Sequence, residues 1–101
     1  MFQGQSAQAD TIVRARVTVQ GRVQGVGFRY HTRERARVLK ISGYVRNQWD
    51  GTVLVEAEGE PPRVRDLISW LRRGPGLAFV SHVSVLWIKP NFSQSSFEVR
   101  Y

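Results

Sequence analysis

Three glycines and an arginine lie close together in the stretch GRVQGVGFRYHT, which spans residues 21–32. Gly21, Gly25 and Gly27 allow a backbone to turn tightly and to approach a ligand without obstruction by β-carbons. Where such a loop leads into a helix, N–H groups without intrahelical partners converge, and the helix dipole adds partial positive charge. Arg29 adds a planar guanidinium that can bind two oxygens of one anion. The stretch therefore predicts a cradle for an oxyanion such as phosphate.

The same stretch does not indicate a nucleotide site, because it lacks the Gly-Lys-Ser/Thr of a P-loop and the acidic residue of a Rossmann fingerprint. Many glycine-rich segments only make a turn, and Arg29 could be one more arginine on a basic helix. Asn47, in SGYVRNQWDGTV, is a second candidate, although asparagine is also typical of turns. His31 and His82 are interpreted as a helix residue and an outward-facing strand residue, and not as acid-base catalysts.

Periodicity predicts the elements that position these residues. Apolar and polar residues alternate from Val13 to Gln20, which predicts a strand with one buried face. From Phe28 the period becomes that of an amphipathic helix. A strand over 42–47, an Asp-Gly hairpin turn and a strand in TVLVEAEGE follow. A helix between Pro61 and Gly74 and strands in VSHVSVLWI and FEVRY complete the chain.

This order, β-α-β-β-α-β with a short terminal strand, predicts a ferredoxin-like α/β sandwich. We expect an α+β fold in which an antiparallel sheet of four to five strands carries two helices on one face. Residues 1–10 are predicted to be a flexible tail, and residues 11–101 a single domain. Because this fold hosts many functions, it does not by itself identify one.

Composition narrows the class of ligand. The chain has 15 Lys and Arg against 8 Asp and Glu, a net charge of +7, and between Arg14 and Arg46 only Glu34 is acidic. An anionic partner fits this excess, although a solvated basic surface would also explain it. The absence of cysteine excludes disulfides and thiolate chemistry and fits a reducing compartment such as the cytoplasm. Charge alone does not distinguish nucleic acid, an acidic membrane surface and a small phosphate compound as the partner. No stretch approaches the roughly 20 apolar residues of a membrane span. We expect no membrane partner.

GRVQGVGFR followed by SGYVRNQWDGTV closely resembles the two signatures of the acylphosphatase family. The segment RGPGLAFV and the closing F-x-V-R-Y fit as well, so the resemblance extends over about Ile12 to Tyr101. It implies a small enzyme, without metal or other cofactor, that hydrolyses small acyl phosphates to a carboxylate and inorganic phosphate. The expected ligands are an acyl phosphate and, as product-like ligands, inorganic phosphate or sulfate. A cytoplasmic monomer that binds no nucleic acid is expected.

The resemblance also assigns roles. It makes Arg29 and Asn47 catalytic, with Arg29 binding the phosphate and Asn47 positioning the attacking water. It implies that phosphate is bound by Arg22, Val23, Gln24, Gly25, Val26, Gly27, Phe28 and Arg29.

Three positions depart from the family pattern. Lys40 and Tyr44 stand where members often carry Gly and Trp, and they are interpreted as packing or surface changes. Gln48 replaces a hydroxyl residue that some members carry after the asparagine, which affects any hydrogen bond that would fix Asn47 or its water.

Two other functions are compatible with parts of the sequence. An RNA-recognition-motif module shares the sandwich and suits a charge of +7. Its Gly-Phe motif belongs on the third strand, however, whereas Gly25 to Phe28 precedes the first helix, and the predicted third strand carries Glu56 and Glu58 instead. A catalytically idle, phosphate-binding regulatory domain would be expected to have lost Arg29 or Asn47, and both are present.

Overall fold

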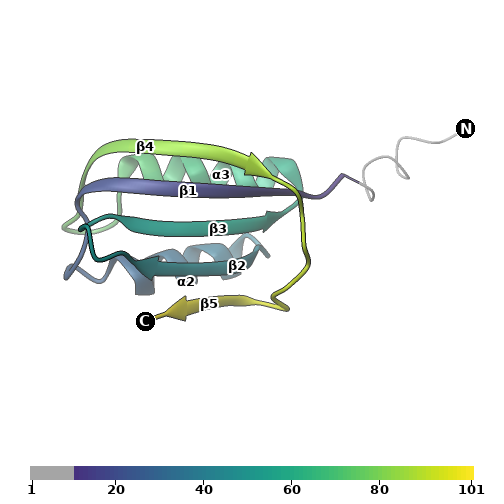
Figure 1. The fold of residues 1–101 in the computed structure, drawn as a ribbon, viewed down its shortest axis with the longest axis horizontal. Coiled ribbons are helices and arrows are strands. Elements are labelled where there is room, and N and C mark those ends of the chain that lie inside the picture. Colours follow the sequence, from purple (N-terminus) through teal and green to yellow (C-terminus); the bar gives the residue numbers. More distant parts are fainter. Residues whose placement is uncertain (1–10) are drawn as a thin grey trace, which may run out of the picture.

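The computed structural model describes residues 11–101, which form a five-stranded sheet with two helices on one face (Figure 1). This confirms the predicted ferredoxin-like sandwich. The tail predicted for residues 1–10 lies outside the described residues. Within residues 11–101, no helix has the length and the apolar run that crossing a membrane requires. In chain order the elements are β1 (Val13–Arg22), α2 (Phe28–Val38), β2 (Ser42–Asn47), β3 (Val53–Gly59), α3 (Pro61–Arg73), β4 (Phe79–Ile88) and β5 (Phe97–Arg100).

The strands lie in the order β4-β1-β3-β2-β5. The first four pair antiparallel as predicted, but β5 pairs parallel with β2, from Gly43 opposite Phe97 to Arg46 opposite Arg100. The reason is the loop 89–96, which crosses from β4 to the opposite edge at the end of the sheet where β2 begins (Figure 1). The sheet is therefore mixed, and the end of β5 lies beside the end of β2.

The core lies between the sheet and the two helices. Alternate residues of the central strands face it, as the period-2 pattern predicted, and the apolar stripes of both helices cover them. This packing fixes where α2 begins and where β2 ends. The core includes Ala15, Val17 and Val19 of β1, Val53, Val55 and Ala57 of β3, Phe28 and Ala36 of α2, and Val64, Leu67, Ile68 and Leu71 of α3.

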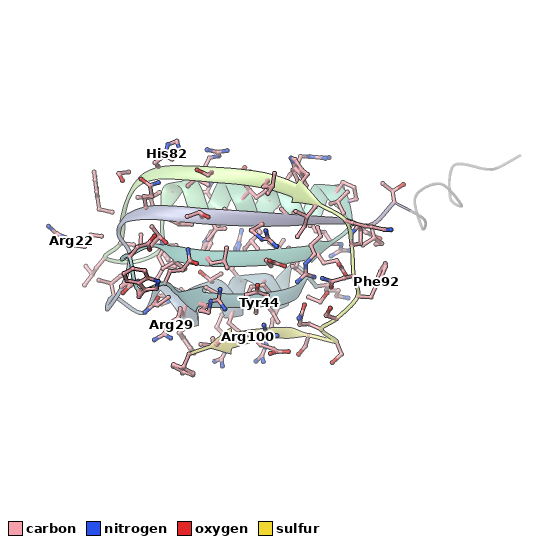
Figure 2. The ribbon with its side chains drawn as sticks, in the orientation of Figure 1. Arg22, Arg29, Tyr44, His82, Phe92 and Arg100 are labelled. Carbon is pink, nitrogen blue, oxygen red and sulfur yellow. The ribbon has the colours of Figure 1, made fainter. Side chains whose placement is uncertain are left out.

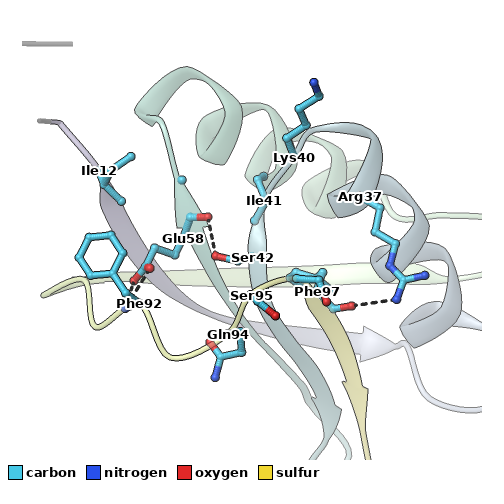
Figure 3. Close-up of a pocket in the computed structure, with 12 residues that line it drawn as sticks. Ile12, Arg37, Lys40, Ile41, Ser42, Glu58, Phe92, Gln94, Ser95 and Phe97 are labelled. Carbon is cyan, nitrogen blue, oxygen red and sulfur yellow. Dashed lines mark hydrogen bonds between the residues drawn. The ribbon is translucent and has the colours of Figure 1, made fainter. Parts of the chain in front are cut away.

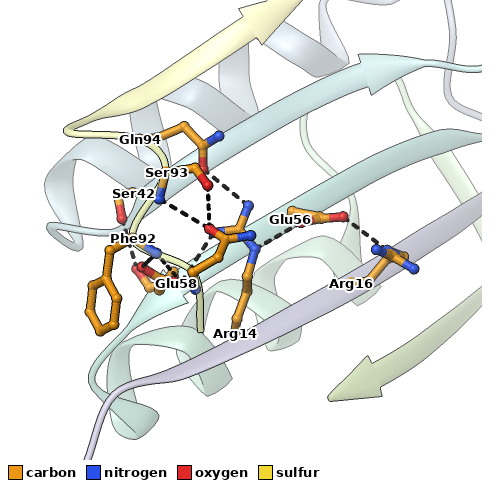
Figure 4. Close-up of polar contacts among 9 residues, drawn as sticks. Arg14, Arg16, Ser42, Glu56, Glu58, Phe92, Ser93 and Gln94 are labelled. Carbon is orange, nitrogen blue, oxygen red and sulfur yellow. Dashed lines mark hydrogen bonds and ion pairs between the residues drawn. The ribbon is translucent and has the colours of Figure 1, made fainter. Parts of the chain in front are cut away.

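The face of the sheet opposite the helices holds a network of charges (Figure 4). Arg14, only 1% exposed, donates from Nε to Glu56 at 2.7 Å and from Nη1 to Glu58 at 3.2 Å. Arg16 donates to the other oxygen of Glu56 at 2.9 Å. Burial alone would raise the pKa of Glu56, but the hydrogen bonds from Arg14 and Arg16 outweigh it and lower that pKa below its ordinary value.

Glu58 extends the network to the loop 89–96. Its carboxylate accepts hydrogen bonds from the backbone N–H groups of Asn91, at 2.9 Å, and Phe92, at 3.1 Å. Arg14 also donates to the side-chain oxygen of Gln94 at 3.0 Å. The loop that determines the direction of β5 is thus held against the open face of the sheet by buried charges.

Lys40 follows α2 in an unusual backbone conformation, with φ of +59°. Its N–H donates to the carbonyl of Arg37 at 3.1 Å, and the N–H of Ile41 donates to the carbonyl of Ala36 at 2.9 Å. These two bonds form a Schellman motif, which usually has glycine at the position of Lys40. The departure at Lys40 is therefore a strained backbone position, which the sequence did not indicate.

Glu56→Gln should lower the free energy of unfolding by about 3 kcal/mol at pH 7, because Arg14 stays buried with one partner weakened. A lowered folded pKa means that this stabilisation is complete above the unfolded value of about 4.3 and is lost as the pH falls through the folded value. Urea denaturation at several pH values should show the gap between wild type and variant narrowing below about pH 4. Glu98→Gln removes an exposed pair with Arg100 and should cost less than about 0.5 kcal/mol.

Lys40→Gly should raise the free energy of unfolding by about 1 kcal/mol, because glycine adopts a positive φ without the strain that other residues pay. The urea midpoint should rise with an unchanged slope. Lys40→Ala, which removes the same charge but keeps the β-carbon, should bring no such gain. Equal gains in both variants would attribute the effect to charge instead.

Candidate active site

A cavity of about 190 Å³ lies where three segments meet: the loop between β1 and α2, the end of β2, and the end of β5. Arg29 and Asn47, the two residues predicted to be catalytic, both line it, and Figure 2 shows Arg29 at that end of the sheet. The full lining is Val23, Gly25, Gly27, Phe28, Arg29, Tyr30, Arg33, Asn47, Val99 and Tyr101.

The loop before α2 offers backbone donors to this cavity. Gly25 and Gly27 both have φ of +76°, a conformation that L side chains rarely adopt, and Gly27 is the N-cap of α2. The N–H of His31, which reaches the carbonyl of Gly27 at 3.0 Å, makes the first bond of the helix. Within residues 11–101, the N–H groups from Gln24 to Tyr30 donate to no other protein group. Unpaired donors at a helix N-terminus are suited to an anion.

Arg29 is held by the end of β5. Its Nη1 donates to the backbone carbonyl of Arg100 at 3.2 Å, and its guanidinium carbon lies 4.6 Å from the centre of the Tyr101 ring. No other protein group within the described residues accepts from its Nε or Nη2. Two N–H-bearing nitrogens of a partly buried guanidinium are therefore free to bind an anion in the cavity.

Asn47 is the last residue of β2 and lies on the face of the sheet that carries the helices. It pairs in register with Val53, whose side chain is fully buried in the core. Asn47 is partly buried, and its side-chain amide has no hydrogen-bond partner among the described residues. The amide can therefore accept from and donate to a water molecule in the cavity.

Gln24 connects the loop to the turn that follows Asn47. Its Nε2 donates to the backbone carbonyl of Gln48 at 2.6 Å and to that of Thr52 at 2.9 Å. The side chain of Gln48 does not reach Asn47; its Nε2 donates across the turn to the hydroxyl of Thr52 at 2.9 Å. The side chain of Gln48, which departs from the family pattern, thus closes the turn, and the side chain of Gln24 connects the turn to the loop.

The remaining departure, Tyr44, lies on the open face of the sheet and away from the cavity lining. Its ring packs 4.1 Å from the guanidinium carbon of Arg100, and Figure 2 shows the two side chains on neighbouring strands. Burial, assisted by the nearby carboxylate of Glu56, raises the pKa of the Tyr44 hydroxyl. The change from Trp is therefore one of packing, as the sequence indicated.

The other residues predicted to bind phosphate divide into two groups. Val23, Gly25, Gly27 and Phe28 line the cavity with Arg29, whereas Arg22, Gln24 and Val26 do not. Arg22 is exposed at the end of β1 and points away from the site (Figure 2), and Val26 packs against the core. Gly21 lies within β1, opposite Val80, and His31 and His82 are exposed and outside the lining.

Four lining residues were not assigned to the site from the sequence. Tyr30 and Arg33 lie on α2, and the spacing of Arg33 four residues after Arg29 could have indicated a shared helix face. Val99 and Tyr101 reach the cavity only because β5 pairs parallel with β2. No local sequence pattern predicts that β5 pairs parallel with β2.

A larger cavity, of about 460 Å³, lies at the opposite end of the strands (Figure 3). Its charged groups include Arg37, which donates to the carbonyl of Phe97 at 3.4 Å, and Glu58, which is engaged by Arg14 and by loop amides. It contains neither Arg29 nor Asn47. The smaller cavity is therefore the candidate active site, since it combines unpaired donors with both predicted catalytic side chains. Within residues 11–101, no three His, Asp or Glu side chains gather as metal ligands would.

Comparisons with known proteins agree on one family. The family model described as Acylphosphatase matches residues 15–99. An acylphosphatase of Thermococcus kodakarensis is 51% identical over 78 residues, which cover 77% of this chain and 86% of that protein. One of Chloroflexus aurantiacus is 47% identical over 87% of this chain and 96% of its own length. The solved structure of an acylphosphatase from Coxiella burnetii superposes with a TM-score of 0.86 and 38% identity, over 92% of this chain and 97% of that one.

Gln24→Ala should lower the free energy of unfolding by about 2 kcal/mol, because two partly buried hydrogen bonds between the loop and the turn are lost. The carbonyls of Gln48 and Thr52 keep their backbone donors, the N–H groups of Gly51 and Gln48. Urea denaturation followed by tryptophan fluorescence measures the loss. Gln48→Ala removes one hydrogen bond at the edge of the turn and should cost about 0.5–1 kcal/mol. If the Gln48 variant loses as much as the Gln24 variant, Gln24 does not hold the loop.

Proposed function

The chain belongs to the acylphosphatase family, and on this basis we propose that the cavity lined by Arg29 and Asn47 is its active site. The protein is an acylphosphatase, a hydrolase of acyl phosphates. One observation carries the assignment of the site. Arg29, Asn47 and the loop whose N–H groups are unpaired come from separate segments and line one cavity.

The loop before α2 and Arg29 bind the phosphate group of the substrate. Unpaired N–H groups of the loop and of the first turn of α2 donate to the phosphate oxygens together with the free nitrogens of Arg29, and the N-terminus of α2 adds its partial positive charge. As the phosphoryl group reacts, these donors are already oriented and need not reorganise. Tyr101 and the carbonyl of Arg100 keep the guanidinium of Arg29 in place.

Asn47 positions the water molecule that attacks the phosphorus. Its amide accepts from and donates to a water molecule and holds that molecule in line with the bond to be broken. The water oxygen bonds to phosphorus while the bond from phosphorus to the acyl oxygen breaks, and the carboxylate leaves with the electron pair. Asn47 is no strong base, so the water proton passes to a phosphate oxygen of the substrate. A carboxylate is a good leaving group, and the reaction therefore needs mainly charge stabilisation and alignment.

We also propose the setting in which the enzyme works. The substrate is a small acyl phosphate, with inorganic phosphate or sulfate as competing ligands, and the enzyme is a cytoplasmic monomer. The absence of cysteine supports a reducing compartment such as the cytoplasm. The open face of β3 supports an enzyme over an RNA-binding module, because Glu56 and Glu58 stand there, paired with Arg14, where such modules carry stacking aromatics.

Benzoyl phosphate hydrolysis, measured with a metal chelator present, should separate the two catalytic roles. Arg29→Ala should lower kcat/KM by roughly 10²–10³-fold and weaken competitive inhibition by inorganic phosphate, because a preorganised anion donor is lost. Asn47→Ala should lower kcat to a similar degree and leave KM and phosphate inhibition nearly unchanged, because the residue serves the water.

The matched control is Arg35→Ala, which removes the same charge from an exposed position on α2 outside the cavity. It should retain kcat/KM within about threefold, since only long-range attraction is reduced. Near-normal turnover in the Arg29 variant would remove this residue from the mechanism. A rise in KM alone in the Asn47 variant would assign Asn47 to binding instead.

A further inference from the structure

A second arginine lines the same cavity. Arg33 lies four residues after Arg29 on α2, about 6 Å further along the helix axis. Its side chain is 29% exposed, and no Asp or Glu belongs to the cavity lining. The mechanism described above gives Arg33 no task, although a partly buried cation in an active site affects any anion that enters it.

The two guanidinium groups are held by different partners. Arg29 is held by β5, against the ring of Tyr101, whereas the guanidinium carbon of Arg33 lies 5.1 Å from the centre of the Tyr30 ring on its own helix. Each arginine thus has its own aromatic face behind it, and packing on a ring leaves the N–H edge of a guanidinium available. The arrangement offers two separate anion-binding groups instead of a single clamp.

The terminal nitrogens of Arg33 are unoccupied. Its Nε donates to Glu34 at 3.2 Å, in a pair whose carboxylate side chain is 48% exposed. Such exposed pairs contribute little stability. No group within the described residues accepts from Nη1 or Nη2 of Arg33. These two nitrogens can bind a carboxylate or phosphate side by side.

We propose that Arg33 determines substrate specificity by binding a second anionic group, at the acyl end of the substrate. The enzyme therefore prefers acyl phosphates whose acyl portion carries a carboxylate or a further phosphate. The inference rests on the proposed function, since it places the reacting phosphate on Arg29 and the loop. With that phosphate bound, the positive charge of Arg33 is left for the rest of the molecule.

Two substrates that differ by one carboxylate test the proposal: benzoyl phosphate and 3-carboxybenzoyl phosphate. In the wild type, kcat/KM should be roughly 10-fold higher for the carboxylated compound, the scale of one charge-assisted hydrogen bond. Arg33→Gln should remove most of that preference, which is a ratio of two kcat/KM values and is therefore independent of any effect common to both substrates. The control Arg35→Gln loses the same charge on the exposed face of α2 and should keep the wild-type preference.

The outcomes are distinct. A wild type that hydrolyses both compounds equally well, or an Arg33 variant that keeps the preference, overturns the inference and leaves the proposed function intact. Equal loss of preference in the Arg33 and Arg35 variants shows general attraction by the basic surface, which also overturns it. If the wild type hydrolyses neither compound, the proposed function itself is overturned.

A binding measurement decides the role of Arg33 without turnover. Calorimetry should show that the wild type binds 3-phosphonopropionate more tightly than ethylphosphonate, which lacks the carboxylate, and that Arg33→Gln binds both with similar affinity. Equal binding of the two phosphonates by the wild type would contradict the proposal.

Discussion

The two hydrogen bonds from Gln24 to the carbonyls of Gln48 and Thr52 connect the parts of the site. The loop that Gln24 belongs to supplies the unpaired N–H groups and leads directly into Arg29, while the turn that it contacts begins immediately after Asn47. The loop before α2 and the turn that follows Asn47, to which we assign phosphate and water binding, are therefore connected by one side chain. A reaction that depends on alignment more than on a strong base requires this rigidity.

Most of the fold could be predicted because its signals are local. The alternation that begins at Val13, the helical period from Phe28 and the Asp-Gly turn each determine one element. Arg29 and Asn47 could be assigned from their motifs, and the structure brings them to one cavity. Val99 and Tyr101 could not, because their place in the site depends on which strand β5 joins and in which direction. The amide of Gln24 likewise acts across a distance in sequence that no periodicity reveals.

The two faces of the sheet are stabilised by different interactions. The face under the helices is apolar and positions α2, whereas the open face relies on Arg14, Glu56 and Glu58, with Arg14 buried among its partners. Removing one of these charges would leave the others buried without a full set of partners and would lower the free energy of unfolding, so the three residues stabilise the fold as a unit. The unit also fastens the loop 89–96, which carries β5 to its place beside β2. A polar cluster remote from the cavity thus determines where Arg100 and Tyr101 stand.

The hydrogen bond from Arg29 to the carbonyl of Arg100 joins residues 71 positions apart. Contacts across so long a stretch of chain form only after the intervening elements are arranged, because the entropy of closing the loop must be overcome first. Helix α2 and the hairpin of β2 and β3 involve near neighbours and can form early. Turnover is therefore expected to return during refolding no earlier than the docking of β5.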